Sequence, residues 1–153
     1  MLNDKIPGCK DQINIQGLKV EPEIKIRGYH TDLYQHVNNA RYLEFLEEGR
    51  WKLLEDHLDL EAFIHNRLFF FVVNINISYR SQAKVGDTIV IRSGLKKIGN
   101  KSAVFRQQIL NKDTRTVCVD ADITFVIADI MGKPIKLEGG LKEKLLLLPL
   151  FEG

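Results

Sequence analysis

A short segment of this 153-residue chain holds its densest cluster of reactive and hydrogen-bonding side chains. Between Tyr29 and Asn39 lie one carboxylate, Asp32, two histidines, two tyrosines and two asparagines. Asn38 or Asn39 is a good N-cap for the helical pattern that follows. Free N–H groups at a helix N-terminus can hold a developing oxyanion, and a carboxylate beside them could activate water or attack a carbonyl. The segment therefore indicates chemistry on a carbonyl group, although Asp and Asn are also common as purely structural caps.

The periodicity of the rest of the chain predicts an α+β fold. Apolar residues recur every three to four positions from Ala40 to about Asp56, which predicts a long helix, and Gly49 inside it suggests close backbone approach to a neighbour. Alternating apolar residues predict strands, and a short second helix and a terminal helix complete the pattern. The predicted strands cover residues 23–27, 68–80, 88–97, 103–110 and 116–129, and the further helices cover about 59–66 and 137–148. Consecutive strands with short turns pair antiparallel, so we expect one sheet wrapped around one long helix, the hotdog arrangement.

Length and composition indicate a single small domain. The chain is 44% hydrophobic and 27% charged, and its longest apolar run, Leu68 to Val73, is far too short to cross a bilayer. We expect a hotdog domain over residues 21–148 that follows an N-terminal extension over residues 1–20. Cys9 and Cys118 fit no metal-ligand spacing, so we expect no metal and no cofactor. With no recognisable signal peptide and few cysteines, a cytoplasmic protein is expected.

Charge is unevenly distributed along the chain. Residues 80–115 carry nine Lys or Arg against two acids, a net +7, whereas the whole chain has a net charge of +2 and the remainder therefore −5. The basic stretch is either a solvated face or a cluster that faces a polyanionic ligand. Nucleic acid is not expected as this ligand, because few aromatic residues interleave with the charges.

Residues Arg27 to Glu47 closely resemble the active-site segment of hotdog-fold acyl-CoA thioesterases of the 4-hydroxybenzoyl-CoA thioesterase group, above all its bacterial long-chain members. The specific part is the pattern Asp-x-x-x-His-Val-Asn-Asn-x-x-Tyr, which runs from Asp32 to Tyr42, and the resemblance extends over about residues 23–144. It implies that Asp32 is the catalytic carboxylate, acting as general base or as nucleophile. It also implies that the backbone N–H of Asn39 is the oxyanion donor.

Two further residues of the segment are site candidates, and His36 is the one expected to take part in catalysis. His36 matches the histidine of a similar motif in plant acyl-ACP thioesterases, and at the position of Tyr34 those enzymes have Asn. Tyr34 is a candidate for substrate binding. The difference at Tyr34 favours hydrolysis of acyl-CoA, with an acyl-ACP thioesterase or a non-catalytic acyl-CoA-binding protein as alternatives.

Acyl-CoA as substrate gives the basic stretch a purpose. Lysines and arginines near strand ends and turns would screen the CoA phosphates, and Arg80, Lys97 and Lys101 are the candidates. Tyr42, Phe45, Leu46, Trp51 and the run Phe69 to Phe71 could line an acyl channel, although such spacing is more typical of ordinary core.

The resemblance also implies a homodimer or homotetramer, with the active site at a subunit boundary. A strand as long as residues 116–129 would leave an exposed sheet edge if it were not paired, which agrees with an oligomer.

Overall fold

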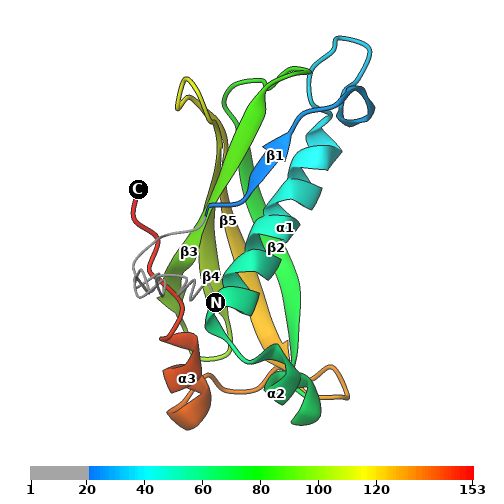
Figure 1. Ribbon diagram of the computed structural model, residues 1–153. Coiled ribbons are helices and arrows are strands. Elements are labelled where there is room, and N and C mark those ends of the chain that lie inside the picture. The colour runs from blue at the N-terminus through cyan, green and yellow to red at the C-terminus, as the bar shows by residue number, and fades with distance from the viewer. Residues whose placement is uncertain (1–20) are drawn as a thin grey trace, which may run out of the picture.

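The computed structural model describes residues 21–153, and the predicted extension over residues 1–20 lies outside the described residues. One antiparallel sheet with the strand order β1-β3-β4-β5-β2 curls around the long helix α1, whereas α2 and α3 lie at one end of the sheet (Figure 1). This is the predicted α+β hotdog arrangement. The elements are β1 (Glu23–Lys25), α1 (Asn39–His57), α2 (Leu60–His65), β2 (Phe69–Tyr79), β3 (Thr88–Ile98), β4 (Ala103–Asn111), β5 (Val117–Ala128) and α3 (Gly139–Leu145).

Helix α1 packs closely on the concave face of the sheet. Its buried stripe includes Tyr42, Phe45 and Leu46, which lie in the core with the inward-facing side chains of β3, β4 and β5. Gly49 allows this approach, because a Cβ there would lie only 2.5 Å from Cγ2 of Ile91. The close contact that the sequence suggested at Gly49 is therefore confirmed.

Strand β5 is an interior strand, so the expectation of an exposed edge along residues 116–129 is wrong. It pairs with β4 on one side and with β2 on the other. Among the described residues, no strand pairs with the outer side of β2, which is therefore the open edge. Periodicity predicts where the strands lie but not their order, which depends on the long crossover through α1 and α2. A bulge between Val72 and Asn74 leaves Val73 exposed, although Ile75 and Ile77 pack against the core.

The opposite edge of the sheet, the outer side of β3, is largely covered. β1 pairs with its first residues, and the chain after α3 returns to its far end. There the N–H of Leu95 donates to the carbonyl of Pro149 (2.8 Å), and the N–H of Phe151 donates to the carbonyl of Leu95 (3.0 Å). Gly94 makes room, since a Cβ there would lie 2.5 Å from the backbone of Phe151.

Candidate active site

The loop between β1 and α1 forms a small hairpin at the end of the sheet opposite α2 and α3 (Figure 1). Thr31 and Val37 pair as an antiparallel bridge, and the N–H of Asp32 donates to the carbonyl of His36 (3.0 Å). Gln35 has a positive φ of 62°, which allows the tight turn at the tip. Asp32 and His36, two of the predicted site residues, therefore face each other across the neck of one hairpin.

The two carboxylate oxygens of Asp32 have different environments. Oδ1 accepts hydrogen bonds from the N–H groups of Tyr34 (2.9 Å) and His36 (3.3 Å), so it is fixed to the loop backbone. Within residues 21–153 no group donates to Oδ2. One oxygen thus orients the carboxylate, and the other is free to accept a proton or to attack an electrophile.

The first turn of α1 leaves one backbone donor unused. Asn38 is the N-cap, and its side chain accepts from the N–H of Ala40 (3.0 Å) while its carbonyl accepts from the N–H of Arg41 (2.9 Å). The N–H of Asn39 has no acceptor in the described part of the chain. An unpaired N–H at the positive end of a 19-residue helix can stabilise an oxyanion.

The connection between β2 and β3 anchors this segment. The buried residue Ala83 accepts from the N–H of Val37 (3.0 Å) and donates its own N–H to the hydroxyl of Tyr42 (3.1 Å). His36 pairs with Lys84 as a second antiparallel bridge. Lys84 therefore lies directly beside the predicted site. Sequence reasoning missed it as a site candidate, since only this tertiary pairing distinguishes it from the other lysines of the basic stretch.

His30 is a structural residue at the base of the loop. Its Nδ1 accepts from the N–H of Arg27 (2.9 Å), its carbonyl accepts from the N–H of Asn38 (3.0 Å), and its ring contacts Phe45 edge to face. Burial lowers its pKa, and the Arg41 cation adds to this effect. The neutral imidazole that results can accept from Arg27, so His30 holds the loop closed.

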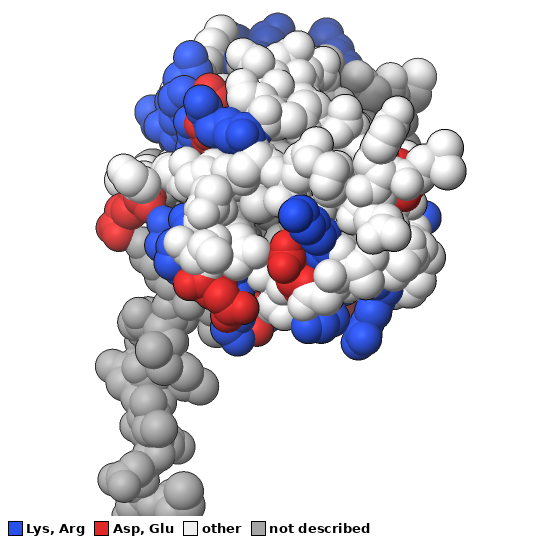
Figure 2. Space-filling model, turned by 90° about the horizontal axis from the view of Figure 1, so that it is seen from above, with Lys and Arg blue, Asp and Glu red and all other residues white. Residues whose placement is uncertain are grey.

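The end of the molecule that carries the loop has a broad uncharged surface, with one group of charged side chains near its middle and the others toward its margins (Figure 2). The loop contributes large exposed side chains there: Leu33 is 98% exposed and Tyr34 is 79% exposed. Tyr34 contacts Asp32 through its backbone only, so its side chain is free to meet a ligand.

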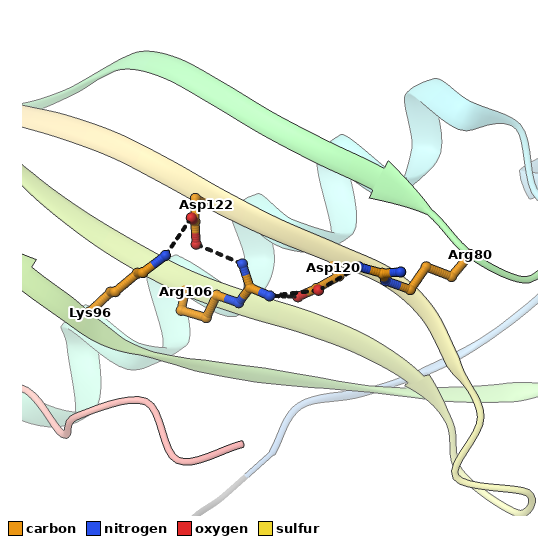
Figure 3. Close-up of polar contacts among 5 residues, drawn as sticks. All are labelled: Arg80, Lys96, Arg106, Asp120 and Asp122. Atoms are coloured by element: carbon orange, nitrogen blue, oxygen red, sulfur yellow. Dashed lines mark hydrogen bonds and ion pairs between the residues drawn. The ribbon is translucent and has the colours of Figure 1, made fainter.

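Most cations of the basic stretch are neutralised in space by acids that are distant in sequence. Asp120 and Asp122 of β5 form a ladder of ion pairs on the sheet face turned away from α1 (Figure 3). Burial would raise the pKa of Asp122, but the hydrogen bonds and charges of Lys96 and Arg106 outweigh it and lower that pKa. Six of the nine cations make ion pairs with acids outside the stretch: Arg80, Arg92, Lys96, Arg106, Lys112 and Arg115.

The three phosphate-binding candidates do not lie together. Arg80 directly follows β2 at the loop end, and its Nη2 is 3.3 Å from Oδ2 of Asp120. Lys97 and Lys101 lie at the other end of β3 and in the turn after it, where Asn100 accepts from the N–H of Leu137 (2.7 Å). A strand of 11 residues spans roughly 35 Å. The structure therefore places Lys97 and Lys101 far from Asp32 of the same chain.

The candidates for the acyl channel divide into core and surface. Tyr42, Phe45 and Leu46 are core residues, whereas Trp51 and Phe71 are about half exposed. An open hollow beside the second half of α1 is lined by Glu48, Trp51, Lys52 and Glu55. Because three of these four side chains are charged, this hollow does not suit an acyl chain.

Residues 21–153 contain neither a metal-ligand cluster nor a membrane-spanning helix. No three His, Cys, Asp or Glu side chains are grouped there as metal ligands would be. None of the helices in that range combines the length and the apolar composition needed to span a bilayer.

Comparison with known proteins gives a consistent result. The chain is 47% identical over 127 residues to the long-chain acyl-CoA thioesterase FadM of Escherichia coli K12, which covers 82% of this chain and 96% of FadM. It is 28% identical over 116 residues to the acyl-CoA thioester hydrolase YbgC of Escherichia coli O6:H1, covering 74% of this chain and 83% of YbgC. The resemblance to the long-chain members of the group is therefore confirmed.

A solved structure matches the fold. The crystal structure of YbaW, a probable thioesterase from Escherichia coli, superimposes with a TM-score of 0.80 at 46% identity and covers 85% of this chain and 98% of YbaW. The model of the thioesterase-like superfamily matches residues 26–145, which include the loop, α1 and the whole sheet from β2 to β5. The chain therefore belongs to the thioesterase-like superfamily, as a thioester hydrolase with the hotdog fold.

Proposed function

We propose that the protein hydrolyses fatty acyl-CoA to a free fatty acid and CoA, with Asp32 and the backbone N–H of Asn39 as its reacting groups. The observation that carries this proposal is the pair of unused groups at the N-terminal end of α1. Oδ2 of Asp32 and the N–H of Asn39 have no partner within the described residues, although the groups around both are paired.

In this reaction a water oxygen bonds to the thioester carbonyl carbon and the carbon–sulfur bond breaks. Oδ2 of Asp32 either takes a proton from the attacking water or attacks the carbonyl itself to form an anhydride that water then hydrolyses. The N–H of Asn39 donates to the carbonyl oxygen as negative charge develops on it. The thiolate of CoA is a good leaving group, so the site needs no strong general acid.

His36 and Tyr34 have supporting roles in this scheme. The N–H of His36 orients Oδ1 of Asp32, and its half-buried side chain lies at the neck of the hairpin. The exposed ring of Tyr34 is in position to contact the substrate near the loop tip.

We infer that the acyl chain is medium to long, because FadM, named a long-chain acyl-CoA thioesterase, is 47% identical to this chain. For the phosphates of CoA, Arg80 and Lys84 are the cations of the basic stretch that lie beside the loop. Lys97 and Lys101 could bind CoA only at the site of another chain, because β3 separates them from Asp32 in their own.

The protein acts as a homodimer or homotetramer in this proposal. The open edge of β2 carries exposed Phe71, Val72 and Val73, and such an edge readily pairs with a second copy. The hollow beside α1 is partly charged, so a second copy would supply the shelter that an acyl chain needs.

A thiol-release assay over short to long acyl-CoA substrates tests the function and both reacting groups. Asp32→Asn should lower kcat by about 100-fold or more, as expected for loss of a general base or nucleophile. For Asn39 the test is proline, which deletes the N–H. Proline is favoured at this first helical position, and ψ of Asn38 is already 137°, within the range that a following proline requires.

Asn39→Ala is the matched control, because alanine keeps the N–H that proline lacks. We expect Asn39→Pro to be about 100-fold slower than Asn39→Ala, the effect of losing one oxyanion donor. Full hydrolysis by Asp32→Asn would refute the role of Asp32. Tight acyl-CoA binding without turnover in the wild type would instead identify a non-catalytic binding protein.

A further inference from the structure

Two tyrosines connect the first half of α1 with the sheet and the connection that follows it. One of them belongs to the helix and the other to the sheet. Tyr42, on α1, accepts a hydrogen bond at its hydroxyl from the N–H of Ala83 in the β2–β3 connection (3.1 Å). Tyr79, the last residue of β2, donates its hydroxyl to the carbonyl of Asn39 in the first turn of α1 (3.2 Å). The two rings lie against each other with their centroids 5.8 Å apart. We call Tyr42, Tyr79 and their two backbone partners the tyrosine clasp.

The tyrosine clasp holds Asn39, the residue whose N–H has no acceptor within residues 21–153. The N-cap Asn38 holds the N-terminal side of Asn39, since its own N–H donates to the carbonyl of His30 (3.0 Å). The bond from Tyr79 holds the other side, at the Asn39 carbonyl. The first turn of a helix otherwise tends to fray, whereas an oxyanion donor must be held to within about 0.5 Å of its productive position.

We propose that Tyr79 is a positioning residue for hydrolysis, whose hydroxyl fixes the first turn of α1 so that the Asn39 N–H stays aligned with Asp32. This inference rests on the proposed function of Asn39. Tyr79 acts through Asn39, and Tyr42 supports it by tying α1 to Ala83, the residue that also binds Val37 of the loop.

Tyr79→Phe is the informative variant, because it removes one oxygen and leaves the ring beside Tyr42. The carbonyl of Asn39 remains within the hydrogen-bond pattern of α1, so the fold should persist with an unchanged unfolding midpoint. We expect kcat for acyl-CoA to fall about tenfold while KM changes less than about twofold, because the loss falls on transition-state stabilisation. Tyr29→Phe is the control, since the exposed hydroxyl of Tyr29 makes no hydrogen bond with residues 21–153.

A double-mutant cycle with Asn39→Pro distinguishes positioning from a general structural role. If Tyr79 acts through the Asn39 N–H, Tyr79→Phe should change kcat less than about twofold once proline has removed that N–H. A full tenfold loss in both backgrounds, or wild-type kcat in Tyr79→Phe, would overturn the proposal. Wild-type kcat in Asn39→Pro would overturn it together with the role of Asn39, and would leave the thioesterase activity itself standing.

Amide hydrogen exchange tests the clasp without any catalysis. The N–H groups of Ala40 and Arg41 belong to the turn that Tyr79 holds, and both are hydrogen-bonded to Asn38. We expect them to exchange about tenfold faster in Tyr79→Phe than in Tyr29→Phe. Equal exchange in the two variants would refute the clasp, even in a protein that hydrolysed no acyl-CoA.

Discussion

At the scale of single residues, the polar groups of the loop are of two kinds. Some are hydrogen-bonded and hold the loop in shape, and others have no partner within the described residues. His30 belongs to the first kind, because its Nδ1, its carbonyl and its ring each have a partner. Asp32 belongs to both, with Oδ1 bound to the backbone and Oδ2 free. A reactive carboxylate can therefore stay exposed and still keep a fixed orientation.

The lowered pKa of His30 makes the loop sensitive to acid. As pH falls below about 6.5, the unfolded chain binds a proton at this residue before the folded chain does, so the free energy of unfolding falls. Protonation would also turn Nδ1 into a donor and break its bond with the N–H of Arg27. His30→Asn keeps an acceptor but cannot titrate. In urea unfolding, the difference in stability between wild type and His30→Asn should shrink from neutral pH to about pH 5.

His65→Asn serves as the control for this experiment. His65 lies exposed on α2, at the end of the sheet opposite the loop, so its variant controls for the loss of a histidine as such. Parallel curves for wild type and His30→Asn would contradict the assignment of His30.

At the scale of elements, the central contact is that between α1 and the sheet. Gly49 is opposite Ile91, Ser93 and Gln107, and Gln107 is fully buried with its amide bonded to the carbonyl of Leu46 (2.9 Å) and to the hydroxyl of Ser93 (2.7 Å). The helix is thus held at a fixed depth by a polar contact as well as by packing. Because the loop and the first turn of α1 are continuous with this packed part of the helix, its depth also determines where they lie.

Gly49→Ala should destabilise the protein, although alanine is the better helix former. Helix propensity alone would stabilise this variant by about 1 kcal/mol. The new Cβ would lie 2.5 Å from Ile91 and 3.0 Å from Gln107 and Ser93, and such overpacking costs typically 1–3 kcal/mol. We expect a net loss of about 1 kcal/mol in urea unfolding. Glu48→Ala, at an exposed neighbouring position, is the control, and a more stable Gly49→Ala would contradict the close contact.

At the scale of the whole molecule, the open edge of β2 and the distribution of charge are the features that bear on assembly. Strand order places β2 at the border of the sheet and encloses β5. The ladder of Lys96, Asp122, Arg106, Asp120 and Arg80 neutralises the outer face of the sheet. The edge of β2, by contrast, exposes the apolar side chains of Phe71, Val72 and Val73.

Replacing Phe71 and Val73 together by lysine should block pairing at this edge, because charged side chains on an edge strand oppose strand addition. Light scattering should give twice or four times the monomer mass for the wild type and the monomer mass for the double variant. Leu147→Lys is the control, an equally exposed apolar residue beyond α3. A double variant of unchanged mass would exclude the β2 edge as the interface.

Sequence alone was sufficient for what depends on local order. The periods of two and 3.6 residues predicted the helices and strands, and the segment from Asp32 to Tyr42 brought the candidate site together within one hairpin and one helix turn. Strand order, by contrast, depends on long-range pairing, so β5 was wrongly expected at an edge.

Contacts between distant residues were likewise beyond prediction. The basic stretch is neutralised by Asp120 and Asp122, which only the register of β4 with β5 brings alongside Arg106. Lys84 and Tyr79 reach the site through the fold and not through the motif.

The segment that follows α3 affects how many copies of the chain could pair through the edges of their sheets. It occupies the far end of the outer side of β3, and β1 occupies the near end. A sheet with two open edges can pair with further copies at both edges without limit. A sheet with one open edge can pair with a single copy only. Pro149 and Phe151, remote from the hairpin of Asp32, thus occupy backbone groups of β3 that another strand could otherwise pair with, and they oppose strand addition on this side of the sheet.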